Sequence, residues 1–178
     1  MKFLKGLAIA ALVAAAPAAA RAADPLAVAL STDQALPVTD TEFDWNGFYV
    51  GVFGVSQYSP AGGTQFGLGL DLGVNARIEF VLLGAEVSVQ GLIGASDSVY
   101  IQGLGRAGLA ATDDVVFYAA AGLGTDLGPV GGTDVLLGGG VELAVTDSVS
   151  LRGQYLHGFA LTGANPKDQV TVGANFHF

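Results

Sequence analysis

Two arginines, Arg106 and Arg152, are the most unusual chemical groups of this 178-residue chain, because each lies in the middle of an alternating apolar and polar segment. Such alternation predicts a β-strand with one apolar and one polar face. An arginine that faces lipid would cost about 2 to 4 kcal/mol, so both side chains should lie on the polar face. Counting back from the predicted turn of each hairpin places Glu142 opposite Arg152 and Glu86 opposite Arg106. Because buried charges need partners, we predict two internal Glu–Arg ion pairs.

Groups for catalysis or metal binding are scarce. The chain has no cysteine, and its two histidines, His157 and His177, fall on opposite faces and near opposite ends of the predicted structure. They are therefore too far apart to share a metal ion. His157 also has no serine beside it that could act as a nucleophile with a base. A G-x-G-x-x-G match at residues 103–108 is followed by no helix, which argues against a dinucleotide site. We expect no catalytic residue, no cofactor and no bound metal.

The elements that must position these charges are short and alternate regularly. Each is close to or longer than the roughly 9 to 11 residues that a tilted strand needs to cross a bilayer. Short turns at 75–77, 112–114 and 146–148 alternate with longer connections, which places both chain ends on the short-turn side. The eight predicted strands are 47–56, 64–75, 78–91, 98–111, 115–125, 133–145, 149–159 and 168–178.

The last predicted strand, 168–178, ends the chain on its apolar face. Val170, Val172, Phe176 and Phe178 share that face, and a terminal strand with an open edge implies a partner strand. We expect that partner to be the first strand, which would close a barrel. The terminal Phe178 and the alternation before it resemble the C-terminal assembly signal of bacterial outer-membrane β-barrels. This resemblance assigns Phe176 and Phe178 to the assembly signal and implies the barrel assembly machinery as a partner.

The N-terminal part of the chain reads as a targeting segment followed by a tail. Residues 1–22 combine a basic start, an apolar run too short to span a membrane and an A-x-A cleavage motif, so they predict a signal peptide, with cleavage after Ala20 as the near alternative. Residues 23–44 carry prolines and acids without a lasting period and are interpreted as a flexible periplasmic tail. Without the first 22 residues, four basic residues remain against 16 acidic ones, a formal charge of −12. Nucleic acid is therefore an improbable partner.

The composition is more apolar and less charged than that of an ordinary soluble domain, so many apolar side chains must be kept from water. Hydrophobic residues make up 51% and charged residues only 13% of the chain, against about 25% charged in an ordinary soluble domain. A soluble lipocalin-like barrel also alternates, but it would cover its outside with solvated charges. The polar faces here are built mainly from Gly, Gln, Ser, Asn and Thr, which suits an internal lumen better.

The segment Trp45-Asn46-Gly47-Phe48-Tyr49-Val50-Gly51, together with the two chain ends, resembles the small outer-membrane β-barrel (porin-like) family of Gram-negative bacteria. The resemblance covers residues 45–178. It implies an all-β fold, an eight-stranded antiparallel up-and-down transmembrane β-barrel in the cell outer membrane, in a family of mostly structural roles.

The aromatic residues are expected in two groups. Tyr49, Phe53, Tyr100 and Tyr118 have inward parity and should partly fill the lumen, with Tyr118 opposite Gly108. The others should form the aromatic girdles at the two membrane interfaces. These girdle residues are Trp45, Phe48, Phe117, Tyr155, Phe159, Phe176 and Phe178.

The function expected from the sequence is that of a structural or surface-exposed envelope protein with a largely plugged lumen. It should be a monomer in outer-membrane lipid and not an enzyme. Two alternatives stay open at this point, a narrow channel for small solutes or ions and a lipid-modifying outer-membrane enzyme. What the connecting loops bind, if anything, is left open by the sequence.

Overall fold

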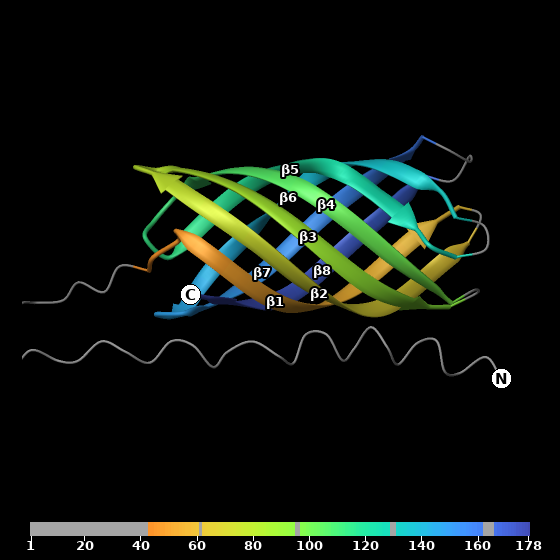
Figure 1. Cartoon of the computed structure of the whole chain (residues 1–178), viewed down its shortest axis with the longest axis horizontal. Helices are drawn as coiled ribbons and strands as arrows, with labels where there is room; N and C mark the ends of the chain where they lie inside the picture. Colours follow the sequence, from red (N-terminus) through yellow and green to blue (C-terminus); the bar gives the residue numbers. More distant parts are fainter. Residues whose placement is uncertain (1–42, 61, 95–96, 129–130, 162–165) are drawn as a thin grey trace, which may run out of the picture. The chain divides into compact units, whose positions relative to one another are not determined.

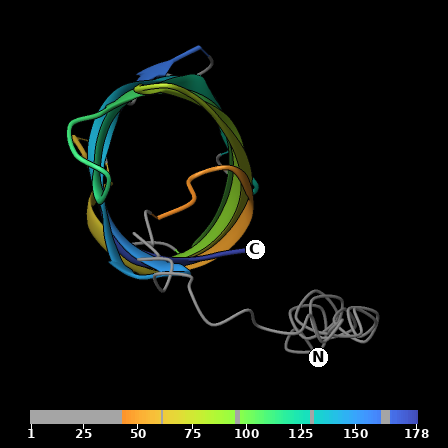
Figure 2. The ribbon, with the colours of Figure 1, turned by 90° about the vertical axis from the view of Figure 1, so that its left-hand side faces the viewer.

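The chain forms a closed antiparallel β-barrel (Figure 1). The computed structural model describes residues 43–178 except 61, 95–96, 129–130 and 162–165, so the predicted signal peptide and residues 23–42 of the tail lie outside the described residues. Each strand pairs with the next strand along the chain. β1 also pairs with β8, which closes the ring that Figure 2 shows end-on. The predicted eight-stranded up-and-down barrel is confirmed. Its strands are β1 (Gly47–Ser59), β2 (Gly63–Ile78), β3 (Val81–Ile93), β4 (Ser98–Ala110), β5 (Val115–Asp126), β6 (Thr133–Thr146), β7 (Val149–Ala160) and β8 (Lys167–His177).

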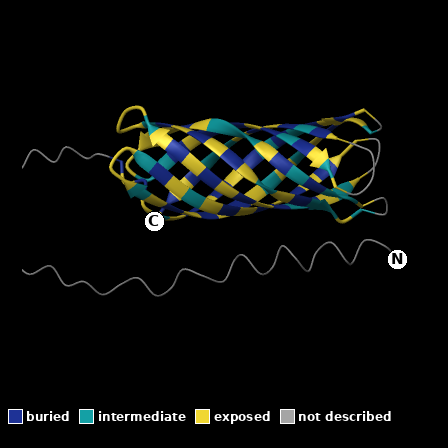
Figure 3. Cartoon of the chain, turned by 90° about the horizontal axis from the view of Figure 1, so that it is seen from above, coloured by how far each residue is buried: buried dark blue, intermediate teal, exposed yellow. Residues whose placement is uncertain are grey.

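The outside of the barrel is apolar and the inside is polar. Exposed and buried residues alternate along most of the length of the strands, which gives the chequered pattern of Figure 3. Leu68 is 78% exposed and Val172 67% exposed on the outer face, whereas Gln90 and Gln169 are 1% exposed on the inner face. A soluble barrel would show the opposite arrangement, so the lipocalin-like alternative is wrong. In the described part of the chain, no helix is long and apolar enough to cross a membrane.

The turn between β2 and β3 lies later in the chain than predicted. Ile78 pairs with Val81, so Glu79 and Phe80 form the turn, and Glu79 has a positive φ of 57°. The prediction of a turn at 75–77 is wrong because Asn75, a common turn residue, instead continues the inward alternation of β2 and is buried. The other short turns, after β4 and β6, fall at the predicted places.

Two apolar clusters cross the lumen at different heights. The one nearer the short turns is formed by Phe43, Trp45, Leu82 and Val116, with Ala110 and Ala144 packed against it. The other lies further along the strands. It is formed by Phe53, Val55, Leu92, Tyr100, Leu104, Tyr118, Ala120, Leu136 and Leu156. We call them the lower and the upper apolar layer.

Trp45 closes the lower end of the lumen rather than joining a girdle. It is completely buried, its Nε1 donates a hydrogen bond to the Asp113 carbonyl oxygen at 2.8 Å, and its ring centroid lies 4.5 Å from that of Phe43. The girdle prediction failed because Trp45 precedes β1, where strand parity does not apply. β1 begins at Gly47, whose φ of 104° lies in a region of backbone conformation that mainly glycine adopts. Figure 2 shows this segment turned into the ring.

The other aromatic residues lie where parity placed them. Tyr49, Phe53, Tyr100 and Tyr118 are all buried in the lumen, and Tyr118 pairs with Gly108 across the β4–β5 hairpin. The remaining predicted girdle residues are exposed on the outer face. They are Phe48, Phe117, Tyr155, Phe159, Phe176 and Phe178.

Candidate functional site: a charge network in the lumen

Three carboxylates and two guanidinium groups form one connected network inside the barrel. Arg106 lies 2.6 Å from Glu142 Oε2 and 3.3 Å from Glu86 Oε2. Arg152 lies 2.7 Å from Asp71 Oδ2 and also pairs with Glu86. Glu86 therefore bridges the two arginines. All five residues are at most 5% exposed, so the network is shielded from water and the attraction between its charges is strong. Burying a charge is costly unless it is paired, and each charge here has a partner of opposite sign.

Tyrosines from β1 and β5 hold Arg106 in place. Arg106 donates a hydrogen bond of 2.6 Å to the Tyr49 hydroxyl, which in turn donates one of 2.6 Å to Glu86. The guanidinium carbon lies 4.0 Å from the centre of the Tyr118 ring, a cation–π contact. Tyr118 donates its own hydroxyl proton to Gln154. The tyrosines thus fix the arginine and occupy the lumen at the same time.

Glu142 is held by three further side chains from β7 and β8. Its Oε1 accepts hydrogen bonds from Ser150 Oγ at 2.6 Å and from Asn175 Nδ2 at 2.8 Å, and it lies 3.3 Å from His177 Nε2. With these contacts, all eight strands contribute side chains to the network. It therefore connects opposite walls of the barrel.

The four sequence-predicted residues meet, and of the two predicted ion pairs the structure shows Glu86–Arg106, whereas Glu142 pairs with Arg106. Glu142 does face Arg152 in the β6–β7 register, as predicted. The prediction that Glu86 faces Arg106 is wrong, because Gly84 occupies that position and Glu86 faces Leu104. Glu86 still pairs with Arg106 diagonally, whereas Glu142 reaches Arg106 and Arg152 reaches Asp71. Asp71 was not assigned to the network, although its inward parity and charge were the signal for it.

A second, smaller polar cluster lies beyond the upper apolar layer. Lys167 Nζ lies 3.1 Å from Asp134 Oδ2 and 3.9 Å from Asp126 Oδ2. The amino group also lies 4.6 Å from the centre of the Tyr100 ring, and Tyr100 donates a hydrogen bond to Asp134. The ammonium group of Lys167 therefore contacts two carboxylates and an aromatic ring at the loop end of the lumen.

The two histidines lie near opposite ends and on opposite faces, as their positions and parity in the predicted strands indicated. His177 is buried at the lower end, against Phe43, Trp45 and Tyr49. His157 lies on the outer rim, where its Nδ1 is 2.8 Å from Asp168 Oδ1. Over the described ranges, no three His, Cys, Asp or Glu side chains are grouped so that they could hold a metal ion.

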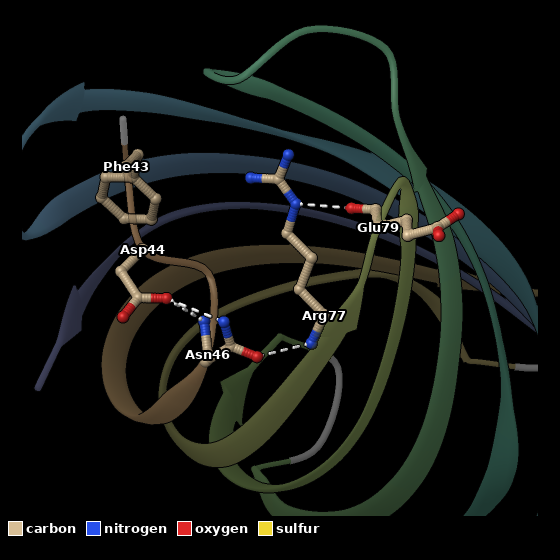
Figure 4. A pocket seen from close by; sticks show the side chains of 5 residues that line it. All are labelled: Phe43, Asp44, Asn46, Arg77 and Glu79. Carbon is tan, nitrogen blue, oxygen red and sulfur yellow. Dashed lines mark hydrogen bonds between the residues drawn. The ribbon is translucent and has the colours of Figure 1, made fainter. Parts of the chain in front are cut away.

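A pocket at the lower mouth is formed by residues that fasten the N-terminal segment to the barrel (Figure 4). Asn46 accepts a hydrogen bond of 2.7 Å from the Arg77 backbone N–H, and Arg77 Nε donates one of 2.8 Å to the Glu79 carbonyl oxygen. Asn46 donates two hydrogen bonds to Asp44, which hold the pKa of that carboxyl group below its usual value. The polar groups of this pocket bind one another, which favours a fastening role.

Comparison with solved structures places this geometry among known barrels. Ail, the attachment invasion locus protein of Yersinia pestis, matches with a TM-score of 0.56 and 12% identity over 74% of this chain and 96% of Ail. Neisserial surface protein A matches with a TM-score of 0.53 and 18% identity over 74% of this chain and 97% of that protein. Searches against protein-family models and curated proteins found no match.

The fold is therefore that of the small, eight-stranded outer-membrane β-barrels of Gram-negative bacteria. A closed ring satisfies the backbone hydrogen bonds within a membrane, and the apolar outer face is suited to lipid. Fold and surface together are those of integral outer-membrane β-barrels.

The predicted assembly signal lies at the seam between β8 and β1. The backbone N–H of Phe178 donates a hydrogen bond of 3.0 Å to the Phe48 carbonyl oxygen. Phe176 and Phe178 are 48% and 72% exposed on the outer face, with ring centroids 5.2 Å apart. The C-terminal phenylalanines are thus outside the barrel, where another protein could contact them during folding.

Changing Phe178 to Asp is expected to reduce folded protein in the outer membrane severalfold while export continues, because a charge replaces the aromatic end of the seam strand. The measurement is the amount of heat-modifiable protein in outer-membrane fractions. Phe80→Asp is the matched control, since Phe80 is an exposed aromatic residue in a turn at the same end. Equal membrane levels of the two variants would contradict an assembly role for Phe178.

Proposed function

We propose that this protein is a structural or surface-exposed component of the cell envelope, a monomeric barrel with a closed lumen. The observation that carries the proposal is the stack of barriers inside the barrel. The lower apolar layer, the charge network and the upper apolar layer follow one another along the lumen. An ion would have to cross two apolar layers and separate buried ion pairs, and both steps are costly in a confined space of low polarity.

The connections at the loop end support a mainly structural role. The strands there are separated only by residues 60–62, 94–97, 127–132 and 161–166. Such short connections offer little area compared with the roughly 800 Å² per partner of a standard protein interface. Adhesion through a broad loop surface is therefore disfavoured, and lipid and the barrel assembly machinery are the partners we propose.

One observation favours a narrow channel as the second candidate. Ser88, Gln90 and Gln102 line one side of the lumen, and each has a buried polar side-chain atom without a hydrogen-bond partner in the described structure. Such atoms commonly bind water. A thread of water along β3 and β4 would give a narrow path past the paired charges.

A conductance measurement distinguishes the two candidates. Purified full-length mature protein, shown to be folded by its heat-dependent mobility, is expected to give no steady single-channel current in planar bilayers. A general porin reconstituted in the same way serves as the positive control. Stable, reproducible current steps from the unmodified protein would overturn the closed-lumen proposal and establish the narrow channel.

An enzymatic role is not part of the proposal. His157 and Asp168 form an acid–base pair at the outer rim, and Tyr155 donates a hydrogen bond of 2.6 Å to the same carboxylate. In the described residues, the hydrogen bonds of this group link it to no serine or threonine hydroxyl. The chain also has no cysteine, so within the described residues this pair has no serine, threonine or cysteine nucleophile beside it of the kind that a lipid-cleaving reaction commonly uses.

A further inference from the structure

We propose that the lumen binds one monovalent metal cation, such as Na⁺, between Asp71 and Asn175 above the backbone of Gly51. Gly51 faces the lumen from β1, with Asp71 opposite on β2 and Asn175 opposite on β8. A methyl group on Gly51 would lie 2.5 Å from Asp71 Oδ1 and closer still to Asn175 Oδ1. Both oxygens therefore converge on the space that the missing side chain leaves, near enough for one ion to contact both.

The two oxygens are acceptors whose own residues are already oriented by other contacts. Asp71 uses Oδ2 to bind Arg152 at 2.7 Å, and Asn175 uses Nδ2 to bind Glu142 at 2.8 Å. The donor end of the Asn175 amide is thereby fixed toward Glu142, so its oxygen must point toward Gly51. Oδ1 of Asp71 and Oδ1 of Asn175 have no hydrogen-bond partner, although the residues are only 5% and 1% exposed. Two acceptors cannot bind one another, so the space between them suits a cation, a hydrogen-bond donor or a proton held by one of the two oxygens.

The charge of the network decides in favour of a cation. Asp71, Glu86 and Glu142 carry three negative charges against the two positive charges of Arg106 and Arg152. One net negative charge buried in the lumen is costly. A monovalent cation brings the sum to zero, whereas a divalent cation would leave an excess positive charge and a water molecule would leave the negative one.

His177 contacts the same network from β8. Its Nε2 lies 3.0 Å from Ser150 Oγ and 3.3 Å from Glu142 Oε1. The salt comparison below distinguishes a bound cation from a proton on the network.

The donor set fits a hard, singly charged ion. One carboxylate oxygen and one amide oxygen are ligands that alkali and alkaline-earth cations prefer, and no thiolate or imidazole that would select a transition metal contributes. The proposal does not depend on the closed-lumen function, since the ion would serve to balance charge in either a structural barrel or a channel.

The test compares stability in different salts at equal ionic strength. The unfolding midpoint of the mature barrel is measured in NaCl, KCl and N-methylglucamine chloride. We expect the midpoint in at least one alkali salt to exceed that in N-methylglucamine chloride and to rise with the logarithm of the ion concentration, as one-site binding requires. Asp71→Asn removes the charge and Gly51→Ala fills the space, so both should abolish the difference. Asp147→Asn, at an exposed turn, should retain it.

A direct measurement on the unmodified protein covers the case in which these variants fail to fold. Crystals grown with Rb⁺ or Tl⁺ should show an anomalous scattering peak beside Asp71 Oδ1 and Asn175 Oδ1. Absence of this peak together with a midpoint indifferent to the cation would overturn the proposal and leave water, or a proton on the network, as the occupant. A salt effect that persists in Gly51→Ala would also overturn it, because the ion would then bind elsewhere.

Discussion

Replacing Arg106 by Met should lower the free energy of unfolding by about 3 to 5 kcal/mol, the usual cost of removing one partner from a buried ion pair. The change leaves Glu142 without its guanidinium partner and leaves Glu86 with Arg152 alone. It also removes the cation–π contact with Tyr118. Met is chosen because its unbranched side chain fills much of the same space, so lost charge rather than a large cavity dominates the effect.

Reversible urea unfolding of the refolded barrel in lipid vesicles provides the measurement. Arg77→Met is the matched control, because Arg77 lies at the lower rim and its ion pair with Asp113 is 3.6 Å long and partly exposed. Such a pair contributes about 1 kcal/mol or less. Losses of similar size in the two variants would show that the interior network does not carry the stability assigned to it.

Double-mutant cycles can identify which ion pairs form. Glu142 lies beside Arg152 in the strand register but contacts Arg106 across the lumen. The coupling energy between Glu142 and Arg106 should therefore exceed that between Glu142 and Arg152, within the range of about 0.5 to 3 kcal/mol for residues in contact. The reverse order would favour the pairing predicted from the sequence over that of the structure.

The sequence was sufficient for what depends on local periodicity. A strand repeats every two residues, so one mid-strand charge on each of β4 and β7 determined which face of those strands is inward. The predicted Glu142–Arg152 register is also found, but it depends on a register shift in β6: the turn pairs Thr146 with Val149, and the irregularity between Ala144 and Thr146 brings Glu142 opposite Arg152. The β3–β4 connection is longer, and its centre could not be located from the sequence, which displaced Glu86 from Arg106 by two residues.

Contacts across the lumen could not be read in the same way. Strand pairing describes neighbours in the wall, whereas the tilt and stagger of a closed barrel decide which side chains meet across it. Long arginine side chains then reach partners on distant strands, as Arg152 does with Asp71. The predicted position of Trp45 was wrong for a related reason. It lies outside β1, and its position depends on the fold of the segment before Gly47 rather than on alternation.

A single arginine on the outer face should be costly in the middle of the barrel and tolerated at its rim. Leu70 lies outward in the middle of β2 and is 45% exposed, and Thr64 lies on the same face near the loop end of that strand. If lipid surrounds the barrel, Leu70→Arg should lower the free energy of unfolding by about 2 to 4 kcal/mol and Thr64→Arg by about 1 kcal/mol or less, because the penalty falls toward the interface.

The comparison is made by urea unfolding in vesicles, where both variants face the same lipid, and then repeated in thinner bilayers. The Leu70→Arg penalty should shrink in the thinner bilayer, since the arginine then lies closer to water. The two positions share strand, face and substituted residue, so general effects of an added arginine cancel between them. Equal and small losses at both positions would mean that water and not lipid covers the outer face, which would overturn the membrane placement itself.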